Sequence, residues 1–242
     1  MLENYFKYLY KWVVSASREK FMEMLDGPLD SLLDLGCWDG ANTLEYGKKA
    51  HARSLFGIEI EKNKAGIASK RGIKVKLSNL NGRFPFKDGS MDAVVANHVI
   101  EHLTQTELFI SEIYRVLKKN GYAVIATPNL ASWHNVFALA MGMQPFSGPH
   151  VRASDHDIKS VNEMDKHKIK NLLKSTEEGK EHLRHLVVMT YKELLKSLRK
   201  AGFAIEKSYG FGYYPLPPLL AGLFAKIDIR HAHYIVVRVR KR

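Results

Sequence analysis

From residue 30 onward, short apolar runs alternate with longer polar stretches whose apolar residues recur at helical spacing. The apolar runs predict strands at 30–35, 54–59, 73–77, 91–96 and 121–126. The stretches between them predict helices at 41–50, 61–70 and 105–118. Strands that alternate with helices build βαβ units, in which the strands run parallel and the helices cover the sheet. The alternation therefore predicts a doubly wound α/β sheet.

Further elements are expected on both sides of this alternation. Apolar residues at three- and four-residue spacing predict helices at 2–16, 131–143 and 190–201. The stretches "FAIEKSY" (203–209) and "AHYIVVRV" (232–239) predict two last strands, which brings the sheet to seven strands. The segment from Ser147 to Arg184 is polar and poor in large apolar residues, so we expect a mobile lid or a short inserted helix there.

Composition limits the class of protein. A chain of 242 residues with 45% hydrophobic content can bury the core of one domain. The single cysteine, Cys37, excludes an internal disulfide framework, and charged residues at Glu3, Lys7 and Lys11 interrupt any signal-peptide core, so we expect a cytoplasmic protein. The formal charge of +12 suits phosphate-bearing partners or anionic lipid, but the basic residues are spread along the chain, as on an ordinary solvated surface.

The stretch "LLDLGCWDG" (32–40) is the first candidate for a ligand site. It leads a buried strand into a glycine turn that opens a helix, where backbone N–H groups can face an anion. One strand later, "LFGIEI" ends with Glu59, whose two carboxylate oxygens can accept hydrogen bonds from both hydroxyls of a ribose. The carboxyl ends of parallel strands share one edge of the sheet, so these groups predict a nucleoside-bearing cofactor. The G-x-x-x-G spacing lacks the dinucleotide pattern G-x-G-x-x-G, and the alternative is a structural bend with Trp38 in the core.

Together with two further stretches, these features resemble the class I S-adenosylmethionine-dependent methyltransferases. The further stretches are "LSNLNGRFPFKDGSMDAVVANHVIEHL" and "YRVLKKNGYAVIATPN", and the resemblance covers about residues 30–130, and more loosely 131–239. It implies S-adenosylmethionine as cofactor and a Rossmann-like, seven-stranded, mostly parallel sheet with an antiparallel final strand. We expect a single domain with an N-terminal helix (1–27), a cofactor-binding core (28–130), an acceptor-side helix and lid (131–189) and a C-terminal helix and strands (190–242).

The resemblance implies a role for each residue that matches the family's motifs. Those of the turn lie beside the methionine part of the cofactor: Asp34, Gly36, Cys37, Trp38 and Gly40. Those after the next strands hold the ribose (Glu59), line the adenine (Ile60, Asn79, Leu80) and border the methionine (Asn97, His98). Two positions depart from the family. Trp38 replaces a glycine, which predicts either ordinary backbone angles or a strained loop, and Asn79 replaces an aspartate.

Catalytic candidates follow the fourth strand in "NHVIEHL". Methyl transfer from a sulfonium requires alignment and, for a hydroxyl acceptor, removal of a proton. We therefore consider His98, Glu101 and His102 as catalytic residues, with a structural role at the next helix as the alternative for the last two. Plant-type small-RNA methyltransferases carry a metal-binding Glu-x-x-Glu-His cluster at this position. The corresponding residues here are His98, Glu101, His102 and either His182 or His185. Because His98 stands where that motif has a glutamate, we expect no metal.

The region after the fifth strand should face the methyl acceptor. Asn129, Trp133 and His134 are the candidates, with Trp133 equally suited to the core. The tract resembles bacterial and archaeal methyltransferases, some of them linked to cell-surface sugars or quinone-like molecules. We therefore expect O-methylation of a small-molecule or glycan- or lipid-linked acceptor, with an RNA methyltransferase or a non-catalytic cofactor-binding protein as alternatives. Residues 212–227 suggest a Pro-bent hairpin on the sheet, or else a peripheral membrane contact.

Overall fold

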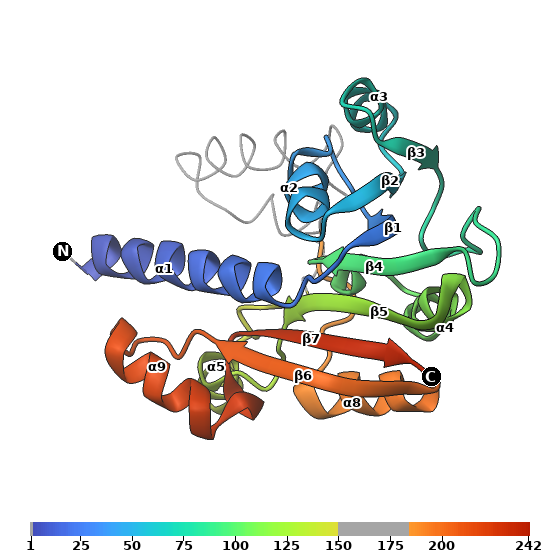
Figure 1. The fold of residues 1–242 in the computed structure, drawn as a ribbon. Helices are drawn as coiled ribbons and strands as arrows, with labels where there is room; N and C mark the ends of the chain where they lie inside the picture. The colour runs from blue at the N-terminus through green and yellow to red at the C-terminus, as the bar shows by residue number, and fades with distance from the viewer. Residues whose placement is uncertain (1, 150–183) are drawn as a thin grey trace, which may run out of the picture.

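The computed structural model describes residues 2–149 and 184–242. Its centre is a seven-stranded sheet with the order β3-β2-β1-β4-β5-β7-β6 (Figure 1). The strands are β1 (Leu29–Leu35), β2 (Ala52–Glu59), β3 (Lys74–Leu77), β4 (Met91–Asn97), β5 (Leu117–Pro128), β6 (Phe203–Phe211) and β7 (Tyr234–Lys241). The five neighbouring strands β3, β2, β1, β4 and β5 pair in parallel. Strand β7 runs antiparallel to both of its neighbours, β5 and β6. The predicted fold class is therefore confirmed.

Helices pack on both faces of this sheet. They are α1 (Leu2–Glu23), α2 (Ala41–Lys49), α3 (Lys62–Lys70), α4 (Thr106–Val116), α5 (Trp133–Ala140), α8 (Tyr191–Lys200) and α9 (Pro218–Ile227), with short 3-10 turns η1 (Ile100–His102) and η3 (Ile229–His231). Apolar side chains of α4 and α8 fill the core on one face, and those of α1 and α2 fill it on the other. Such burial on both faces explains why the central strands are continuous apolar runs.

The predicted elements lie within a few residues of the observed ones, with two differences. Helix α1 continues to Glu23, seven residues beyond the predicted end, because Phe21 and Met24 extend its buried stripe. The preferred hairpin at 212–227 is wrong. The prolines there precede helix α9, and Pro218 occupies its first turn, where a missing N–H removes no helical hydrogen bond.

Strand order explains where a ligand can bind. β1 pairs with β2 on one side and with β4 on the other, so the chain reverses its direction of winding at β1. In open α/β sheets, ligands bind beyond the carboxyl ends of the strands at this switch point. The loops that follow β1, β2 and β4 therefore form the candidate site.

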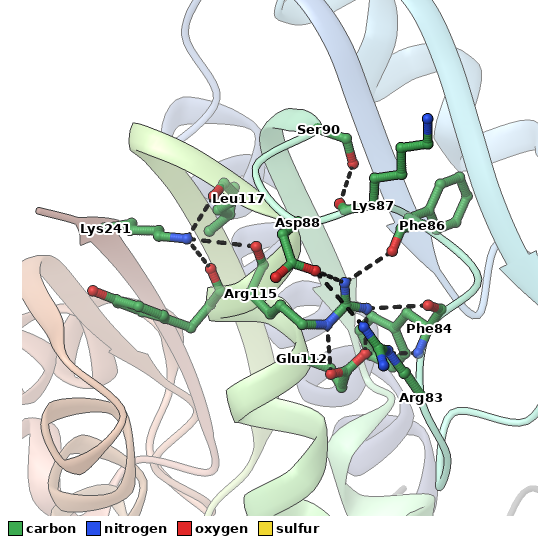
Figure 2. Close-up of polar contacts among 11 residues, drawn as sticks. Arg83, Phe84, Phe86, Lys87, Asp88, Ser90, Glu112, Arg115, Leu117 and Lys241 are labelled. Carbon is green, nitrogen blue, oxygen red and sulfur yellow. Dashed lines mark hydrogen bonds and ion pairs between the residues drawn. The ribbon is translucent and has the colours of Figure 1, made fainter.

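The opposite end of the sheet is fixed by an arginine-centred network (Figure 2). Arg115 on α4 donates hydrogen bonds to the carbonyl oxygens of Phe84 and Phe86 and to the carboxylates of Asp88 and Glu112, at 2.6–3.1 Å. These bonds attach the loop before β4 to α4. The network lies among elements remote from the strand ends described above, so we assign it a structural role.

The predicted lid at 147–184 lies outside the described residues, apart from its ends. In the described part of the chain, no helix combines the length and the apolar character that crossing a bilayer demands.

Candidate active site

The turn after β1 is held in an unusual backbone conformation. Gly36 and Gly40 have positive φ angles of 69° and 81°, which glycine adopts without a Cβ penalty. The backbone N–H groups of Gly36 and Cys37 both donate to the carbonyl oxygen of Ile58, at 2.9 and 3.1 Å, and so tie the turn to β2. A Cβ on Gly40 would lie 2.3 Å from the side chain of Ile73, so Gly40 is also required for packing.

Trp38, at the tip of this turn, has a φ of 50°, which is rare for a side chain of its size. Of the two alternatives for this residue, ordinary backbone angles or a strained loop, the positive φ fits the second. Its indole is 42% exposed, with the Lys64 ammonium 4.4 Å from the ring centroid. The alternative that places Trp38 in the core is wrong, and strain of this kind is often found where backbone is held for a ligand.

The carboxylate of Glu59 closes the other side of the turn. Its Oε2 accepts a hydrogen bond from the backbone N–H of Trp38 at 2.8 Å, and its Oε1 accepts from those of Ile60 and Glu61 at 2.8 and 2.9 Å. The glycine turn and the carboxylate predicted to hold a ribose are therefore in direct contact. Oε1 thus already accepts two hydrogen bonds, whereas Oε2 keeps a second lone pair for a ligand hydroxyl.

These groups line one pocket at the carboxyl edge of the sheet. Eight predicted residues lie in its wall: Gly36, Trp38, Glu59, Ile60, Asn79, Leu80, His98 and His102. The sequence analysis missed five others: Glu61, Ser78, Asn81, Val99 and Leu103. Each of the five is next in the sequence to a predicted residue, so extending the prediction to the whole loop after each strand would have found them. A Cβ on Gly36 would stand 3.2 Å from Val99, against the wall of this pocket.

Five predicted residues support the pocket without lining it: Asp34, Cys37, Gly40, Asn97 and Glu101. Asp34 is buried and accepts a hydrogen bond from the hydroxyl of Thr43, and burial raises the pKa of its carboxyl to about 7. Burial likewise raises the pKa of the Cys37 thiol, which packs beneath the turn against Gly57. The amide of Asn97 donates to the hydroxyl of Tyr46 at 3.1 Å. These contacts fix the turn from behind, so direct contact with a cofactor is not part of our proposal for these side chains.

The loop after β3 forms the outer wall of the pocket. The side-chain oxygen of Asn79 accepts from the backbone N–H of Asn81 at 2.9 Å, as in an Asx turn. Asn81 in turn accepts from the backbone N–H groups of Thr104 and Gln105, which anchors the loop at the start of α4. Asn79 still offers a second lone pair for the amino group of a base.

His98 combines backbone strain with a carboxylate partner. Its φ is 57°, and its Nδ1 lies 3.1 Å from Oε1 of Glu101. A carboxylate can only accept, so Nδ1 carries the hydrogen, and in that tautomer Nε2 is the atom that can accept a proton. Strain of about 1–2 kcal/mol for a left-handed residue other than glycine is typical of functional positions.

Glu101 is the buried partner in this pair. Its side chain is fully buried, and its Oε2 accepts a hydrogen bond from the hydroxyl of Thr127 at 3.0 Å. Burial is the largest influence and raises the pKa of this carboxyl, but the hydrogen bond with His98, a backbone hydrogen bond and the nearby charges of His98 and His102 together hold the pKa below its usual value. Glu101 is therefore ionised at neutral pH and can orient the imidazole.

One cluster has the composition of a metal site. Glu101, His102 and His185 each offer one ligand atom, and these atoms lie within 4.8 Å of one another. The Nδ1 atoms of His102 and His185 face the carbonyl oxygens of Arg184 and Ser147, at 2.9 and 2.6 Å. Histidines that ligate metals commonly donate their other N–H to such a carbonyl. Two imidazoles and one carboxylate would suit a divalent transition metal.

Of the three acceptor candidates, only His134 lines a cavity, and that cavity adjoins the first. Asn129 is fully buried, and its amide is bonded to four backbone groups. Trp133 donates from Nε1 to Asp228 at 2.9 Å and stacks on His231, on the outer side of α5. Because their polar groups already have structural partners, Asn129 and Trp133 are not among the acceptor-binding residues that we propose.

Fold and pocket thus define an α/β domain that can bind a nucleoside-bearing cofactor. Residues 33–125 match a family described as "Methyltransferase domain". The chain is 32% identical over 102 residues to a "Probable S-adenosylmethionine-dependent methyltransferase" of Mycolicibacterium smegmatis, covering 40% of this chain and 38% of the relative. It is 33% identical over 115 residues to ajmaline N-methyltransferase of Rauvolfia serpentina, covering 43% and 39%. An S-adenosylmethionine-dependent methyltransferase structure from Mesorhizobium loti has a TM-score of 0.60 at 16% identity, covering 92% and 96% of the two chains.

These similarities support a methyltransferase domain over residues 33–125, and the whole fold is that of S-adenosylmethionine-dependent methyltransferases of known structure. S-adenosylmethionine is the cofactor of that class. The aligned region spans about two fifths of the length of the first two curated relatives. The match to the family model ends at residue 125, within β5, so the residues after β5 lie outside it.

Proposed function

We propose that the chain binds S-adenosylmethionine in the pocket between β1, β2 and β4 and transfers its methyl group to an oxygen of a small-molecule or glycan- or lipid-linked acceptor. The observation that carries the proposal is the contact between the strained turn and the ribose-type carboxylate: the backbone N–H of Trp38 donates to Glu59 at 2.8 Å, and both residues line one pocket. Glycine at position 36 leaves room for a ligand beside the turn.

When bound, S-adenosylmethionine supplies an electrophilic methyl group. The chain's own groups then have two tasks, to align the acceptor and to take up its proton. His98 has Nδ1 fixed by Glu101, so its Nε2 can accept the proton of an acceptor hydroxyl. Glu101 stabilises the imidazolium that forms and is a positioning residue. The presence of a base at this pocket supports oxygen as the acceptor atom.

Calorimetry on the wild-type chain tests the cofactor assignment. We expect S-adenosylmethionine and S-adenosylhomocysteine to bind with micromolar dissociation constants, on the order of −8 kcal/mol. NADH is the control, because the turn lacks the dinucleotide spacing. Binding of NADH in place of both sulfur compounds would overturn the proposal. Binding without transfer of labelled methyl to any acceptor class would favour the non-catalytic alternative.

A metal-assisted reaction is the second candidate, and the cluster of Glu101, His102 and His185 favours it. If it operates, treatment with EDTA will abolish labelled methyl transfer, and Mn²⁺ or Zn²⁺ will restore it. His185→Ala would then lower the affinity for Mn²⁺ by 10-fold or more, since it removes a ligand. We expect EDTA to leave turnover unchanged, because both carboxylate oxygens of Glu101 already form hydrogen bonds, one with His98 and one with Thr127.

RNA and a membrane surface are two further possible partners, and we rank both below a small-molecule or glycan- or lipid-linked acceptor. The charge of +12 would support RNA binding, which should weaken steeply as salt is raised. Helix α9 exposes Leu219, Leu223 and Ile227, which would suit a peripheral membrane contact. A cytoplasmic location stays a prediction.

A further inference from the structure

A second cavity adjoins the cofactor pocket. Its volume is about 430 Å³, within the range of sites for small molecules. Segments far apart in the chain contribute to it, from α1 through the end of β5 to the start of β7. Its lining residues are Tyr10, Pro128, His134, Phe146, Ser147, His185, Tyr214, His233 and Tyr234.

Two pairs of rings separate the cavities. The ring of His98, in the wall of the cofactor pocket, packs edge-on against that of Tyr234, in the wall of the second cavity, with 4.8 Å between centroids. His102 and His185 form a similar pair at 5.2 Å. A molecule in the second cavity therefore lies beside this ring pair, and it is methylated only if its hydroxyl reaches past Tyr234 to Nε2 of His98.

The lining is aromatic and uncharged. None of the nine lining residues is a lysine, arginine, aspartate or glutamate. Burial lowers the pKa of His134 to about 4 and that of His233 well below its usual value, so both rings are neutral at pH 7. A phosphate or carboxylate would find no lysine or arginine among these nine residues, despite the positive charge of the chain. Flat aromatic walls instead suit a ring that packs edge-on or offset.

Two hydroxyl groups in this wall lack partners. Within residues 2–149 and 184–242, neither Oγ of Ser147 nor the hydroxyl of Tyr214 forms a hydrogen bond, although both atoms are buried. Ser147 is only 3% exposed. Buried polar groups are nearly always hydrogen-bonded. Two unsatisfied hydroxyls at one cavity therefore indicate an occupant with a polar group of its own.

We infer that this cavity is the acceptor site and that it takes a neutral, ring-bearing, mainly apolar molecule with a hydroxyl group. The inference rests on the proposed function, because it makes the occupant the molecule that is methylated. Aromatic walls hold the ring, Ser147 and Tyr214 bond its polar group, and the ring pair of His98 and Tyr234 marks the side from which the methyl group arrives. Phosphate-bearing acceptors, including RNA, do not fit this lining.

A matched pair of probes tests the chemical class. With the chain saturated with S-adenosylhomocysteine, calorimetry should show 2-naphthol binding with a dissociation constant below about 1 mM, and 2-naphthyl phosphate binding at least 10-fold more weakly. Equal or tighter binding of the phosphate would overturn the neutral class. No binding of 2-naphthol up to its solubility limit would overturn the site.

Two conservative variants test the location. Tyr214→Phe and Ser147→Ala should each weaken 2-naphthol binding by about 3- to 10-fold, since each removes one hydrogen bond to the ligand. The free protein should lose no thermal stability, because neither hydroxyl has a hydrogen-bond partner among residues 2–149 and 184–242. Tyr209→Phe, on the outer part of β6, is the control and should bind as wild type. Unchanged affinity in both variants, with S-adenosylhomocysteine binding intact, would refute the acceptor site alone; loss of cofactor binding in the wild-type chain would refute the proposed function.

Discussion

Replacing Glu59 by alanine should weaken the binding of S-adenosylhomocysteine by at least about 100-fold, or about 3 kcal/mol. The variant loses the carboxylate that accepts from the ribose, and a hydrogen bond to a charged group contributes about 1.5–3 kcal/mol. It also leaves the backbone N–H groups of Trp38, Ile60 and Glu61 without their acceptor, which loosens the turn itself. Calorimetry of both proteins under the same conditions measures the difference.

Two further variants separate the carboxylate's roles. Glu59→Gln keeps one oxygen acceptor and should fall between the wild type and the alanine variant. Glu107→Ala removes an exposed carboxylate from α4 and should bind the cofactor as the wild type does. Far-UV circular dichroism of each variant checks that the sheet is intact. An alanine variant that folds and binds S-adenosylhomocysteine with wild-type affinity would show that the ribose lies elsewhere.

The cofactor half of the site was predictable because it depends on local sequence. Apolar runs located the strands, and parallel strands end at one edge, so Gly36 and Glu59 had to meet there. Their direct bridge through the backbone N–H of Trp38 follows from the two adjacent strands, since β1 and β2 are paired in register. The family's motifs then named positions such as Asn79 and Leu80, which line the pocket.

The second cavity, which we propose as the acceptor site, was not predictable in the same way. It joins residues from α1, β5 and β7, and its ring contacts connect positions more than 100 residues apart, such as His98 with Tyr234. No periodicity encodes such contacts. Asn129 illustrates the difficulty: a polar residue after a strand suggests a ligand contact, whereas in the structure its amide donates to the backbone carbonyl oxygens of Arg230 and Ala232.

The helix after the prolines was missed for a local reason. Pro215, Pro217 and Pro218 lie close together, a pattern typical of a bend, and the apolar run that follows is short. A proline in the first turn nevertheless starts a helix well. Leu219 and Ile227 remain 79% and 80% exposed on α9, so the apolar run is not buried against the sheet as a hairpin would require.

Replacing His98 by asparagine should lower kcat for methyl transfer to a hydroxyl acceptor by about 100- to 1,000-fold, within the usual contribution of a general base. Affinity for S-adenosylhomocysteine should change by less than about 3-fold. Asparagine tolerates a positive φ, so the variant removes the proton acceptor without adding strain to the loop. Labelled methyl transfer to the acceptor, measured at saturating cofactor, gives kcat, and calorimetry gives the affinity.

A second histidine–carboxylate pair supplies the matched control. His231 lies 2.8 Å from Asp228, three residues away as in the pair of His98 and Glu101, but it lines neither cavity. His231→Asn should therefore keep wild-type kcat. Glu101→Gln should reduce kcat, since the imidazole loses the carboxylate that orients it and stabilises the imidazolium. A His98 variant with unchanged kcat would show that the acceptor needs no base, which is expected of a nitrogen acceptor that reacts as the free amine, and would move the proposed acceptor atom from oxygen to nitrogen.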